Sequence, residues 1–454
     1  METLRIKCIT WNVQTSWPEE DMSTLLGLKD VKQNMTSVKK CTPPALPDIY
    51  IISLQEVKSQ PQNVVLDMFF EEPWTKQFLD DLSAHNYVRI AGERLQGCVL
   101  NIIVKKELVA QLRDIHTSVT RTGFGGLWGN KGGVSVRFSV GGCSVCSVNC
   151  HLAAHDGGYS ERVLQYNTIL HSTTFPQCSP TTSILYHDYV FWMGDLNFRL
   201  ASSISGEEIA RLVSKGSLEE LYELDELKKA QSARDAFEPL TEAPLTFPPT
   251  YKYKENHVSD YDLSRRPAWT DRIVHQVFRR PAWTDRILHQ VLPDAYEHVK
   301  LSAEQTSYSA LQQYRQSDHK PVIAEYLIKV FSDHRERCVR LQPTGDWRVC
   351  EGGTATVSLD SDVVVSNSDY IALFKDNFCN MEQYITYCYL PEIKDQSGPA
   401  TFTVALQDDL IHDAGMYRLV YVSRLYNCYL GMSDAFAVQL SPQLMPAQSR
   451  LGTA

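Results

Sequence analysis

The succession of strand-like and helix-like segments limits the fold more strongly than any other feature of this sequence. Apolar runs rich in Val, Ile and aromatic residues recur through the first three quarters of the chain and end in polar or turn-forming residues. Among them are IKCITWNV, DIYIISLQEV, GGVSVRFSV, YVFWMGDLNF and KPVIAEYLIKV. Helical patterns lie between them at residues 74–85, 160–174 and 207–229. Strands with interspersed helices predict an α/β fold, a two-sheet sandwich flanked by helices.

The pattern changes at residues 332–340, where the segment SDHRERCVR is polar and charged. Short strand-like runs follow it, separated by turn residues and without a helical pattern, which is typical of a small all-β sandwich. We therefore expect an α/β domain at residues 1–331, a linker at 332–340 and a β-sandwich at 341–440. Residues 441–454 are expected to form a disordered tail.

Charge and hydropathy argue against two classes of protein. The formal net charge of −10 disfavours a protein that holds nucleic acid through a basic surface. No apolar run approaches the roughly 18–20 residues of a membrane span. The N-terminal segment METLRIKCITWNV reads directly as a strand rather than as a secretory signal. We therefore expect a cytoplasmic protein.

One segment is duplicated. RRPAWTDRIVHQVF at 265–278 is followed at once by RRPAWTDRILHQVL at 279–292, with twelve of fourteen positions identical. Only one copy can occupy a given strand position, and the other becomes part of a loop, which costs little because closure entropy grows slowly with length. We expect the second copy in the sheet, because a long connection ahead of it is easier to accommodate at the rim.

Polar residues that a buried core could not use stand at the ends of several predicted strands. They are Asn12, Glu56, Asn149, His151, Asp195, Asn197, Asp318 and His319. Because each follows an apolar run, the chain delivers them to one rim of the sheets. Glu56 and Asn12 offer the few oxygen ligands that, with phosphate and water, suit Mg²⁺.

A phosphoryl group bound to such a cation needs an oriented water, charge neutralisation and a hydrogen-bond donor. Asp195 can polarise the water and Asn197 can orient it. His151 and His319 can bind phosphoryl oxygens, best in their protonated forms. A carboxylate beside His319 would help by raising the pKa of its imidazole.

The motifs TWNV, LQEV, NKGGV, NCHLAAH, GDLNFR, PTYKY, PAWTDRI and SDHKPV follow one another in this order. In this order they resemble the inositol polyphosphate 5-phosphatases, which share the exonuclease–endonuclease–phosphatase fold. The resemblance covers roughly residues 4–330, and the last 100 or so residues, with SDYIALFK and GMSDAFAV, resemble the SKICH domain. It implies Mg²⁺-dependent removal of the 5-phosphate from phosphatidylinositol 4,5-bisphosphate, phosphatidylinositol 3,4,5-trisphosphate and soluble inositol polyphosphates.

The resemblance also implies roles for individual residues. The implied metal ligands are Asn12, Glu56 and, near the ion, Asp318. The implied catalytic residues are Asp195, Asn197, His151, His319 and the WTDR aspartate that supports His319, either Asp271 or Asp285. The implied substrate ligands are Asn149, Lys131, Tyr251, Lys252 and the arginine two residues before the WTDR proline, either Arg265 or Arg279.

Two apolar groups flank the expected mouth of the site. Leu127 and Trp128 stand among glycines with few neighbours to pack against, so we expect them to insert into the membrane interface. We expect Phe69, Phe70 and Trp74 to pack in the core. The resemblance implies that the C-terminal sandwich binds a protein partner and recruits the protein peripherally to the endoplasmic reticulum and plasma membrane.

Two alternatives keep the same fold. AP endonucleases share the WNV, LQE, GDLN and SDH elements, but a nuclease needs a basic groove along several phosphates, and this chain is acidic. The second alternative is an inactive or weakly active phosphoinositide-binding protein, in which the duplication disturbs the site.

Overall fold

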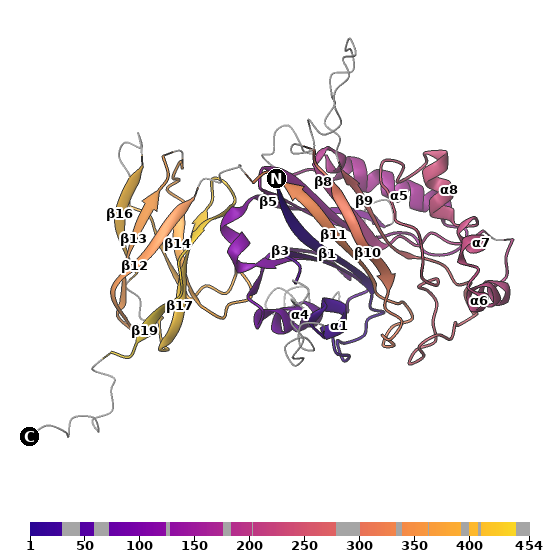
Figure 1. Ribbon diagram of the computed structural model, residues 1–454, viewed down its shortest axis with the longest axis horizontal. Helices are drawn as coiled ribbons and strands as arrows, with labels where there is room; N and C mark the ends of the chain where they lie inside the picture. The colour runs from indigo at the N-terminus through magenta and orange to yellow at the C-terminus, as the bar shows by residue number, and fades with distance from the viewer. Residues whose placement is uncertain are drawn as a thin grey trace, which may run out of the picture. The chain divides into compact units, whose positions relative to one another are not determined.

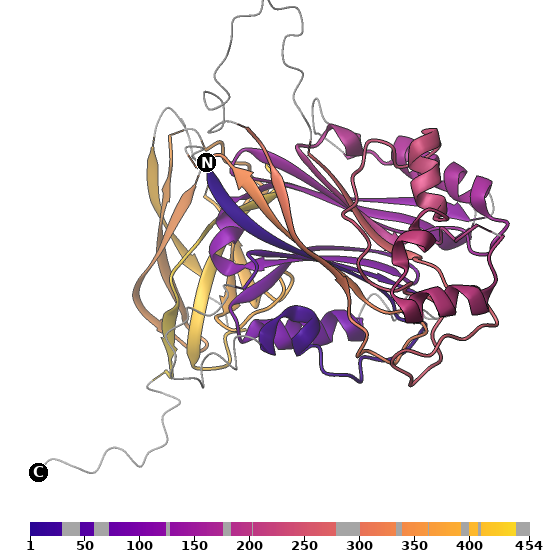
Figure 2. The ribbon, with the colours of Figure 1, turned by 45° about the vertical axis from the view of Figure 1, so that its right-hand side comes forward.

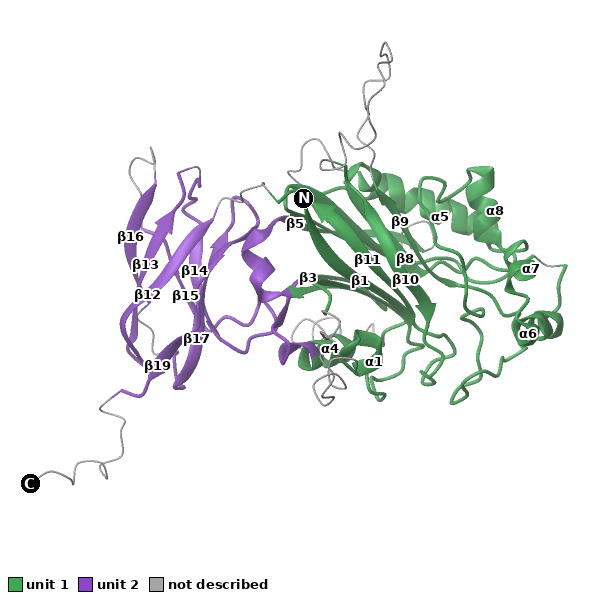
Figure 3. Cartoon of the chain, in the orientation of Figure 1, with its two compact units in different colours: residues 1–81, 91–104, 116–333 green, residues 82–90, 105–115, 334–454 purple. Residues whose placement is uncertain are grey.

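The computed structural model describes residues 1–29, 46–58, 72–123, 128–175, 183–201, 203–277, 300–332, 338–361, 363–391, 399–406 and 410–441, with only the backbone of 128–130. The chain divides into two compact units (Figure 3). The first comprises residues 1–81, 91–104 and 116–333, and the second comprises 82–90, 105–115 and 334–454. Among the described helices, none combines the length and the apolar character needed to cross a membrane.

Strands alternate with helices up to residue 332, as the sequence predicts. In chain order the elements are β1 (Glu2–Asn12), α1 (Ser23–Leu26), β2 (Ile49–Gln55), α4 (Pro73–Ser83), β3 (Tyr87–Leu95), β4 (Cys98–Lys105), η2 (Lys106–Gln111), β5 (Leu112–Gly123), β6 (Trp128–Val140), β7 (Cys143–His151), α5 (Tyr159–Ser172), η4 (Ile184–Tyr186), β8 (Tyr189–Asp195), α6 (Gly206–Lys215), α7 (Leu218–Tyr222), α8 (Glu226–Ala233), β9 (Asp271–Val277), β10 (Ala303–Ala310) and β11 (Val322–Val330).

These strands form two sheets that pack face to face, which confirms the predicted α/β sandwich. Within the described residues one sheet has six strands, in the order β10-β11-β1-β2-β4-β3, and the other has five, in the order β5-β6-β7-β8-β9. Strands β1 and β2 contact β7 and β8 of the opposite sheet. Helix α4 covers the outer face of the first sheet, and α5 and α8 cover that of the second (Figures 1 and 2). Covered on both faces, β2 and β8 are buried at every residue.

Along β7 and β8, every second side chain points into the space between the two sheets. Along β7 and β8, residues such as Val148 and Trp192 pack outward against Ile169 of α5 and Leu227 of α8. Because successive strand residues face opposite sides, the intervening positions point toward the other sheet. His151 and Asp195 occupy such positions at the ends of their strands. Each large apolar side chain buried under the helices contributes about 1.5–3 kcal/mol to holding these strand ends in place.

The first copy of the duplicated segment forms strand β9, so the expectation that the second copy occupies the sheet is wrong. Strand β9 pairs antiparallel with β8, with Asp271 opposite Asp195. Asp285 and Arg279, in the second copy, lie outside the described residues.

The physical reason is that the first copy follows directly on the segment with which it pairs. Tyr251 and Ala268 exchange backbone hydrogen bonds. The guanidinium of Arg272, fully buried, binds Asp225 at 3.0 Å and also Glu242. A short connection and a buried ion-pair network therefore fix the first copy, and these long-range partners could not be read from a local pattern.

The second unit is mainly β-structure, as predicted for the C-terminal part of the chain. Its strands are β12 (Val339–Arg348), β13 (Gly352–Leu359), β14 (Tyr370–Lys375), β15 (Thr386–Tyr389), β16 (Ala400–Leu406), β17 (Gly415–Ser423), β18 (Cys428–Met432) and β19 (Phe436–Gln439). Among described residues the order is β15-β14-β17-β19-β12-β13-β16, with β18 beside β17. The edge strands β15 and β16 contact each other, so the sheet folds back on itself.

The second unit also takes in two short segments from earlier in the chain, 82–90 and 105–115. The backbone N–H of Arg89 donates to the carbonyl of Cys379 at 2.8 Å. The ammonium of Lys106 donates to the carbonyl of Asp376 at 2.5 Å and lies 4.3 Å from the centre of the Phe378 ring. The exact domain limits stay a prediction, and most of the expected linker and tail lies outside the described residues.

Candidate active site

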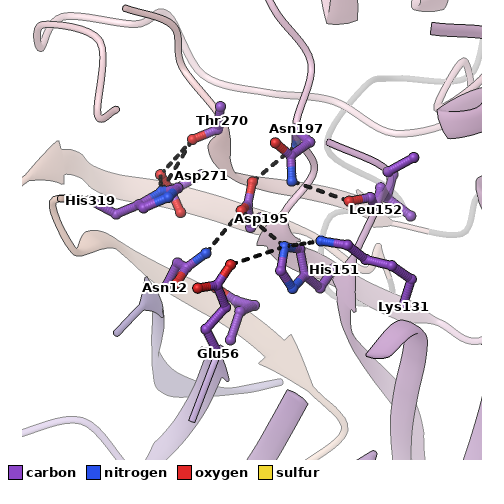
Figure 4. A network of polar contacts seen from close by, with 12 residues as sticks. Asn12, Glu56, Lys131, His151, Leu152, Asp195, Asn197, Thr270, Asp271 and His319 are labelled. Carbon is purple, nitrogen blue, oxygen red and sulfur yellow. Dashed lines mark hydrogen bonds and ion pairs between the residues drawn. The ribbon is translucent and has the colours of Figure 1, made fainter. Parts of the chain in front are cut away.

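The candidate site lies where the ends of four buried strands meet. β1 runs parallel to β2, and β7 runs parallel to β8, so the C-terminal ends of each pair share an edge. Asn12, His151 and Asp195 are the last residues of β1, β7 and β8, and Glu56 follows β2. Figure 4 shows these side chains pointing toward one another from the two sheets.

Asp195 is at the centre of this group. Its Oδ2 accepts a hydrogen bond from the Asn12 amide at 3.1 Å and lies 3.3 Å from Nε2 of His151, while Oδ1 accepts from the backbone N–H of Asn197 at 3.1 Å. Burial disfavours the charged form, but the contact with His151 and the positive charge of His319 outweigh it and hold the pKa of Asp195 below its ordinary value. Asp195 is therefore a buried, ionised carboxylate able to accept a hydrogen bond from water.

His151 links Asp195 to the exposed carboxylate. Glu56 Oε1 lies 3.8 Å from Nε2 of His151, and the side chain of Glu56 is 41% exposed. The ammonium of Lys131 contacts the same imidazole nitrogen. Burial, helped by the charge of Lys131, lowers the pKa of His151, and burial likewise lowers the pKa of Lys131. Two carboxylates and a lysine thus converge on one imidazole.

His319 and Asp271 form a buried ion pair on the other side of Asp195. Nδ1 of His319 lies 2.9 Å from Oδ2 of Asp271, which also accepts hydrogen bonds from Thr250 at 2.7 Å and Thr270 at 2.9 Å. Burial alone would lower the pKa of His319, but the charge and hydrogen bond of Asp271, with the charge of Asp195, raise it to about 9. His319 is therefore an imidazolium at neutral pH, as the sequence predicts for a histidine with a carboxylate partner.

Asn197 follows Asp195 by two residues and has a left-handed backbone, with φ at 58°. Its Nδ2 donates to the carbonyl of Leu152 at 3.1 Å, and its Oδ1 accepts from the guanidinium of Arg199. The amide is therefore held at both ends, and among the described residues one N–H and one lone pair are left for a water molecule.

Asn149 does not fit its predicted role as a substrate ligand. It is fully buried, and its Nδ2 donates to the carbonyls of Leu54 at 2.9 Å and Val99 at 2.7 Å. Its Oδ1 accepts from Gln55 at 2.8 Å. Strand alternation places Asn149 on the same face as His151 but deeper between the sheets, so its amide joins the two sheets instead of reaching the rim. We correct its role to a structural one.

The donor atoms at the rim suit a hard divalent cation. The carboxylates of Glu56 and Asp195 both approach His151. The Asn12 side chain lies beside them, with its Nδ2 donating to Asp195 and its Oδ1 accepting from the backbone N–H of Gln14 at 3.1 Å, so the two carboxylates are the oxygen donors that face this region directly. Asp318, the third predicted ligand, lies beside His319, with its Oδ1 3.9 Å from Nε2 of that imidazole. Burial raises the pKa of Asp318.

Among the described residues, Asp195, Asp271 and His319 also bring ligand-type atoms within 4.8 Å of one another. The ion pair between His319 and Asp271 already accounts for this proximity, so we do not assign a metal to them.

Of the other predicted substrate residues, Tyr251 contacts the imidazolium, whereas Lys252 and Arg265 contact other groups. The Tyr251 ring stacks on His319, with ring centres 4.4 Å apart. Lys252 forms an ion pair with Asp262 at 3.0 Å, and Arg265 is exposed, 3.5 Å from Nδ1 of His155. Within the described residues, neither cation forms a hydrogen bond or ion pair with Asp195, Asn197 or His319.

Sequence reasoning missed three residues of the site, namely Arg199, Thr250 and Thr270. Each stands within a quoted motif, GDLNFR, PTYKY or PAWTDRI, so the motif was the available signal, but their partners are distant in sequence. Of the two predicted apolar groups, Trp74 is buried against Trp11, which confirms its core role. Phe69, Phe70, Leu127 and the Trp128 side chain lie outside the described residues.

Known proteins share this organisation. A model of the endonuclease/exonuclease/phosphatase family 2 matches residues 9–278 and 275–325, and a SKICH domain model matches residues 339–438. The crystal structure of the inositol polyphosphate 5-phosphatase domain of SPsynaptojanin, in complex with inositol (1,4)-bisphosphate and calcium, superposes with a TM-score of 0.57 at 27% identity. That match covers 73% of this chain and 86% of that one. A Cimex nitrophorin ferrous NO complex, with a TM-score of 0.54 at 21% identity over 72% of this chain and 99% of that one, shows the shared fold alone.

Two named relatives are similar over nearly all of this chain. The chain is 30% identical to mouse inositol polyphosphate 5-phosphatase K, covering 96% of this chain and 90% of that protein. It is 32% identical to human phosphatidylinositol 4,5-bisphosphate 5-phosphatase A over 98% of this chain, and it spans 42% of the length of that relative. The family and SKICH matches, together with these relatives, show that the chain belongs to the inositol polyphosphate 5-phosphatases of the endonuclease/exonuclease/phosphatase family.

Proposed function

We propose that this protein hydrolyses the 5-phosphate of phosphatidylinositol 4,5-bisphosphate, phosphatidylinositol 3,4,5-trisphosphate and soluble inositol polyphosphates, with Mg²⁺ as its cofactor. The observation that carries the proposal is the convergence of a buried ionised Asp195, an oriented Asn197 and the imidazolium of His319 at one rim. Removal of this phosphate would dampen phosphoinositide signalling.

The choice of Mg²⁺ rests on the donor set. Glu56 and Asn12 would hold the ion, with Asp195 beside them, since these oxygen donors suit a hard cation that keeps several waters. When bound, the ion would polarise a phosphoryl oxygen and offset the negative charge that develops during hydrolysis.

The protein residues supply the proton acceptor and the hydrogen-bond donors. Asp195 accepts a proton from the attacking water, and Asn197 orients that water through its remaining N–H and lone pair. His319, held by Asp271 through Nδ1, directs its Nε2–H toward a phosphoryl oxygen. Lys131 adds positive charge on the opposite side, beside His151.

The proposed substrate choice is supported by cations of the chain, and the proposed membrane contact by the sequence. Lys252, which follows Tyr251 of the His319–Tyr251 stack, and the exposed Arg265, which lies 3.5 Å from Nδ1 of His155, are cations suited to a second phosphate on the inositol ring. We further propose that Leu127 and Trp128 contact the membrane, and that the C-terminal domain binds a protein partner and recruits the enzyme from the cytoplasm to the endoplasmic reticulum and plasma membrane.

Replacing Leu127 and Trp128 together with Ser should test the membrane contact. Hydrolysis of soluble inositol trisphosphate should be spared and hydrolysis on liposomes weakened, since inserting one Trp and one Leu is worth about 2–4 kcal/mol by apolar burial. Equal losses on both substrates would show instead that the loop shapes the pocket.

The two alternatives are less well supported. The net charge of −10 does not favour a nuclease, which depends on a basic track along several phosphates. An inactive binding protein is disfavoured because the first copy of the duplicated segment completes the His319–Asp271 pair.

The direct test is phosphate release from phosphatidylinositol 4,5-bisphosphate and from inositol 1,4,5-trisphosphate, with Mg²⁺ and with EDTA. We expect release only with the metal, with phosphatidylinositol 4-phosphate and inositol 1,4-bisphosphate as the respective products. Binding of either substrate without turnover would favour the inactive protein, and cleavage of abasic-site DNA would favour the nuclease.

A further inference from the structure

Arg199 is a buried arginine without a carboxylate partner among the described residues. Arg199 is 5% exposed, and its Nε has no hydrogen-bond partner among the described residues. Burying an unpaired guanidinium costs stability, because a charge removed from water must be compensated. We therefore expect the role of this arginine to depend on the residues that its guanidinium contacts.

Arg162, nearby, shows the usual arrangement for comparison. It is fully buried, lies with its guanidinium 5.4 Å from the Phe198 ring centre, and forms an ion pair with Glu226 at 2.7 Å. The same carboxylate oxygen of Glu226 accepts the backbone N–H of Arg199 at 2.9 Å. Glu226 thus neutralises Arg162 and fixes the Arg199 backbone, while the Arg199 side chain makes its contacts with site residues.

Those contacts join the two halves of the site. One guanidinium nitrogen of Arg199 donates to Oδ1 of Asn197. The guanidinium carbon lies 4.9 Å from the centre of the Tyr251 ring, and that ring stacks on His319. We propose that Arg199 is a positioning residue, which fixes the Asn197 amide for the attacking water and braces the Tyr251–His319 stack on the phosphate side.

The chemistry of the two side chains explains why an arginine is needed. The terminal torsion of an asparagine is broad and roughly two-fold, so its oxygen and nitrogen can exchange places. A guanidinium is donor-only, so it selects the orientation in which the Asn197 oxygen faces Arg199 and the N–H groups face Leu152 and the water. Its planar face also stacks on an aromatic ring, which a lysine ammonium cannot reproduce with the same geometry.

This inference rests on the proposed function, and Arg199→Met tests it against the matched control Arg162→Met. With Mg²⁺ and inositol 1,4,5-trisphosphate, Arg199→Met should lower kcat by about 10- to 100-fold, the range for losing a supporting partner of a site residue. KM should change less than about threefold, and the melting temperature should not fall, since an unpaired buried charge is removed. Arg162→Met should lower the melting temperature, because it breaks an ion pair, and keep kcat within about threefold.

Two further variants separate position from charge. Arg199→Lys keeps the charge but not the fork, so it should recover less than about a third of the lost kcat. In a double-mutant cycle, Arg199→Met should slow the Asn197→Ala variant by less than it slows the wild type, because the part that acts through Asn197 is already lost and only the support of the Tyr251–His319 stack remains to be removed. Additive losses, full recovery by Lys, or a rise in KM with unchanged kcat would each overturn the positioning role.

A crystal structure of Arg199→Met gives a readout that does not depend on turnover. We expect the Asn197 amide to rotate away from the Leu152 carbonyl and the Tyr251 ring to shift from His319. An unchanged Asn197 and Tyr251 would refute the inference. Absence of phosphate release by the wild-type protein would count against the proposed function, and the structure of the variant would still decide whether Arg199 positions these groups.

Discussion

At the scale of single residues, neighbours decide the protonation state of each group in the site. Asp195 and His319 are both buried, yet their pKa values move in the directions that keep both charged. The cause is mutual: Asp271 and Asp195 favour the imidazolium, and the positive charge of His319 helps to keep Asp195 ionised. A proton acceptor and a charged donor can therefore coexist at neutral pH.

Asp195→Asn should lower kcat by at least roughly a hundredfold, the loss expected for a positioned general base, with little change in substrate affinity. The amide retains the shape of the carboxylate, but only one of its two terminal atoms can accept a hydrogen bond, whereas both oxygens of Asp195 do so, and the melting temperature should therefore fall. Phosphate release under single-turnover conditions measures the chemical step. A variant that keeps more than about a tenth of the wild-type rate would remove Asp195 from the role of base.

Glu56→Gln should raise the Mg²⁺ concentration needed for half-maximal activity, because a neutral amide is a weaker ligand for a hard cation. Glu56 is the more exposed of the two rim carboxylates, so the substitution should disturb packing little. A Mg²⁺ titration at saturating substrate gives the answer. Superimposable titrations of wild type and variant would exclude Glu56 from the metal site.

At the scale of elements, the duplicated segment shows how a strand is chosen between two nearly identical sequences. The first copy occupies the strand position because of its contacts with other parts of the chain. It pairs with β8, its Asp271 accepts a hydrogen bond from Thr250, and its Arg272 forms ion pairs with Asp225 and Glu242. Local propensity cannot separate the copies, because twelve of fourteen positions are the same.

Asp271→Ala should therefore cost about 10- to 100-fold in kcat, since His319 loses the partner that orients it and raises its pKa. Asp285→Ala is the matched control, identical in local sequence, and should stay within about twofold of wild type. Steady-state phosphate release from a soluble substrate compares them. The reverse pattern would place the second copy beside His319, and two mild effects would mean that either copy can serve.

The strands and the rim residues were predictable from sequence because apolar runs and the polar residues that end them are local features. The two-sheet sandwich, the helices at α4 and α5 and the meeting of Asp195 with His151 follow from that pattern. The structural role of Asn149 could not be predicted in this way, because it depends on the carbonyls of Leu54 and Val99, which are distant in sequence and accept its hydrogen bonds between the sheets. Arg199 was missed for the same reason, since the partner that gives it meaning, Tyr251, is 52 positions away.

At the scale of the whole molecule, the candidate site belongs to the first unit, whereas the second unit is built from segments of both the N-terminal and the C-terminal parts of the chain. The residues that form the candidate site all belong to residues 1–81, 91–104 or 116–333. The second unit nevertheless includes 82–90 and 105–115, which are continuous with strands β3, β4 and β5 of the two-sheet body. Activity and stability should therefore respond differently to loss of the C-terminal part.

Truncation after Phe331 should leave kcat on inositol 1,4,5-trisphosphate within about threefold, because no site residue is removed. It should also lower the melting temperature, since the backbone of Arg89 and the buried ammonium of Lys106 lose their partners at Cys379 and Asp376. At about 1 kcal/mol per hydrogen bond, and less than the roughly 2–4 °C per kcal/mol typical of domains of 150–250 residues, the loss of these two bonds amounts to a few degrees. In the full chain, Lys106→Met removes the ammonium alone and should cause only part of this fall in melting temperature. An unchanged melting temperature would show that these contacts contribute nothing, whereas loss of activity in a folded truncated protein would show that the second unit shapes the site.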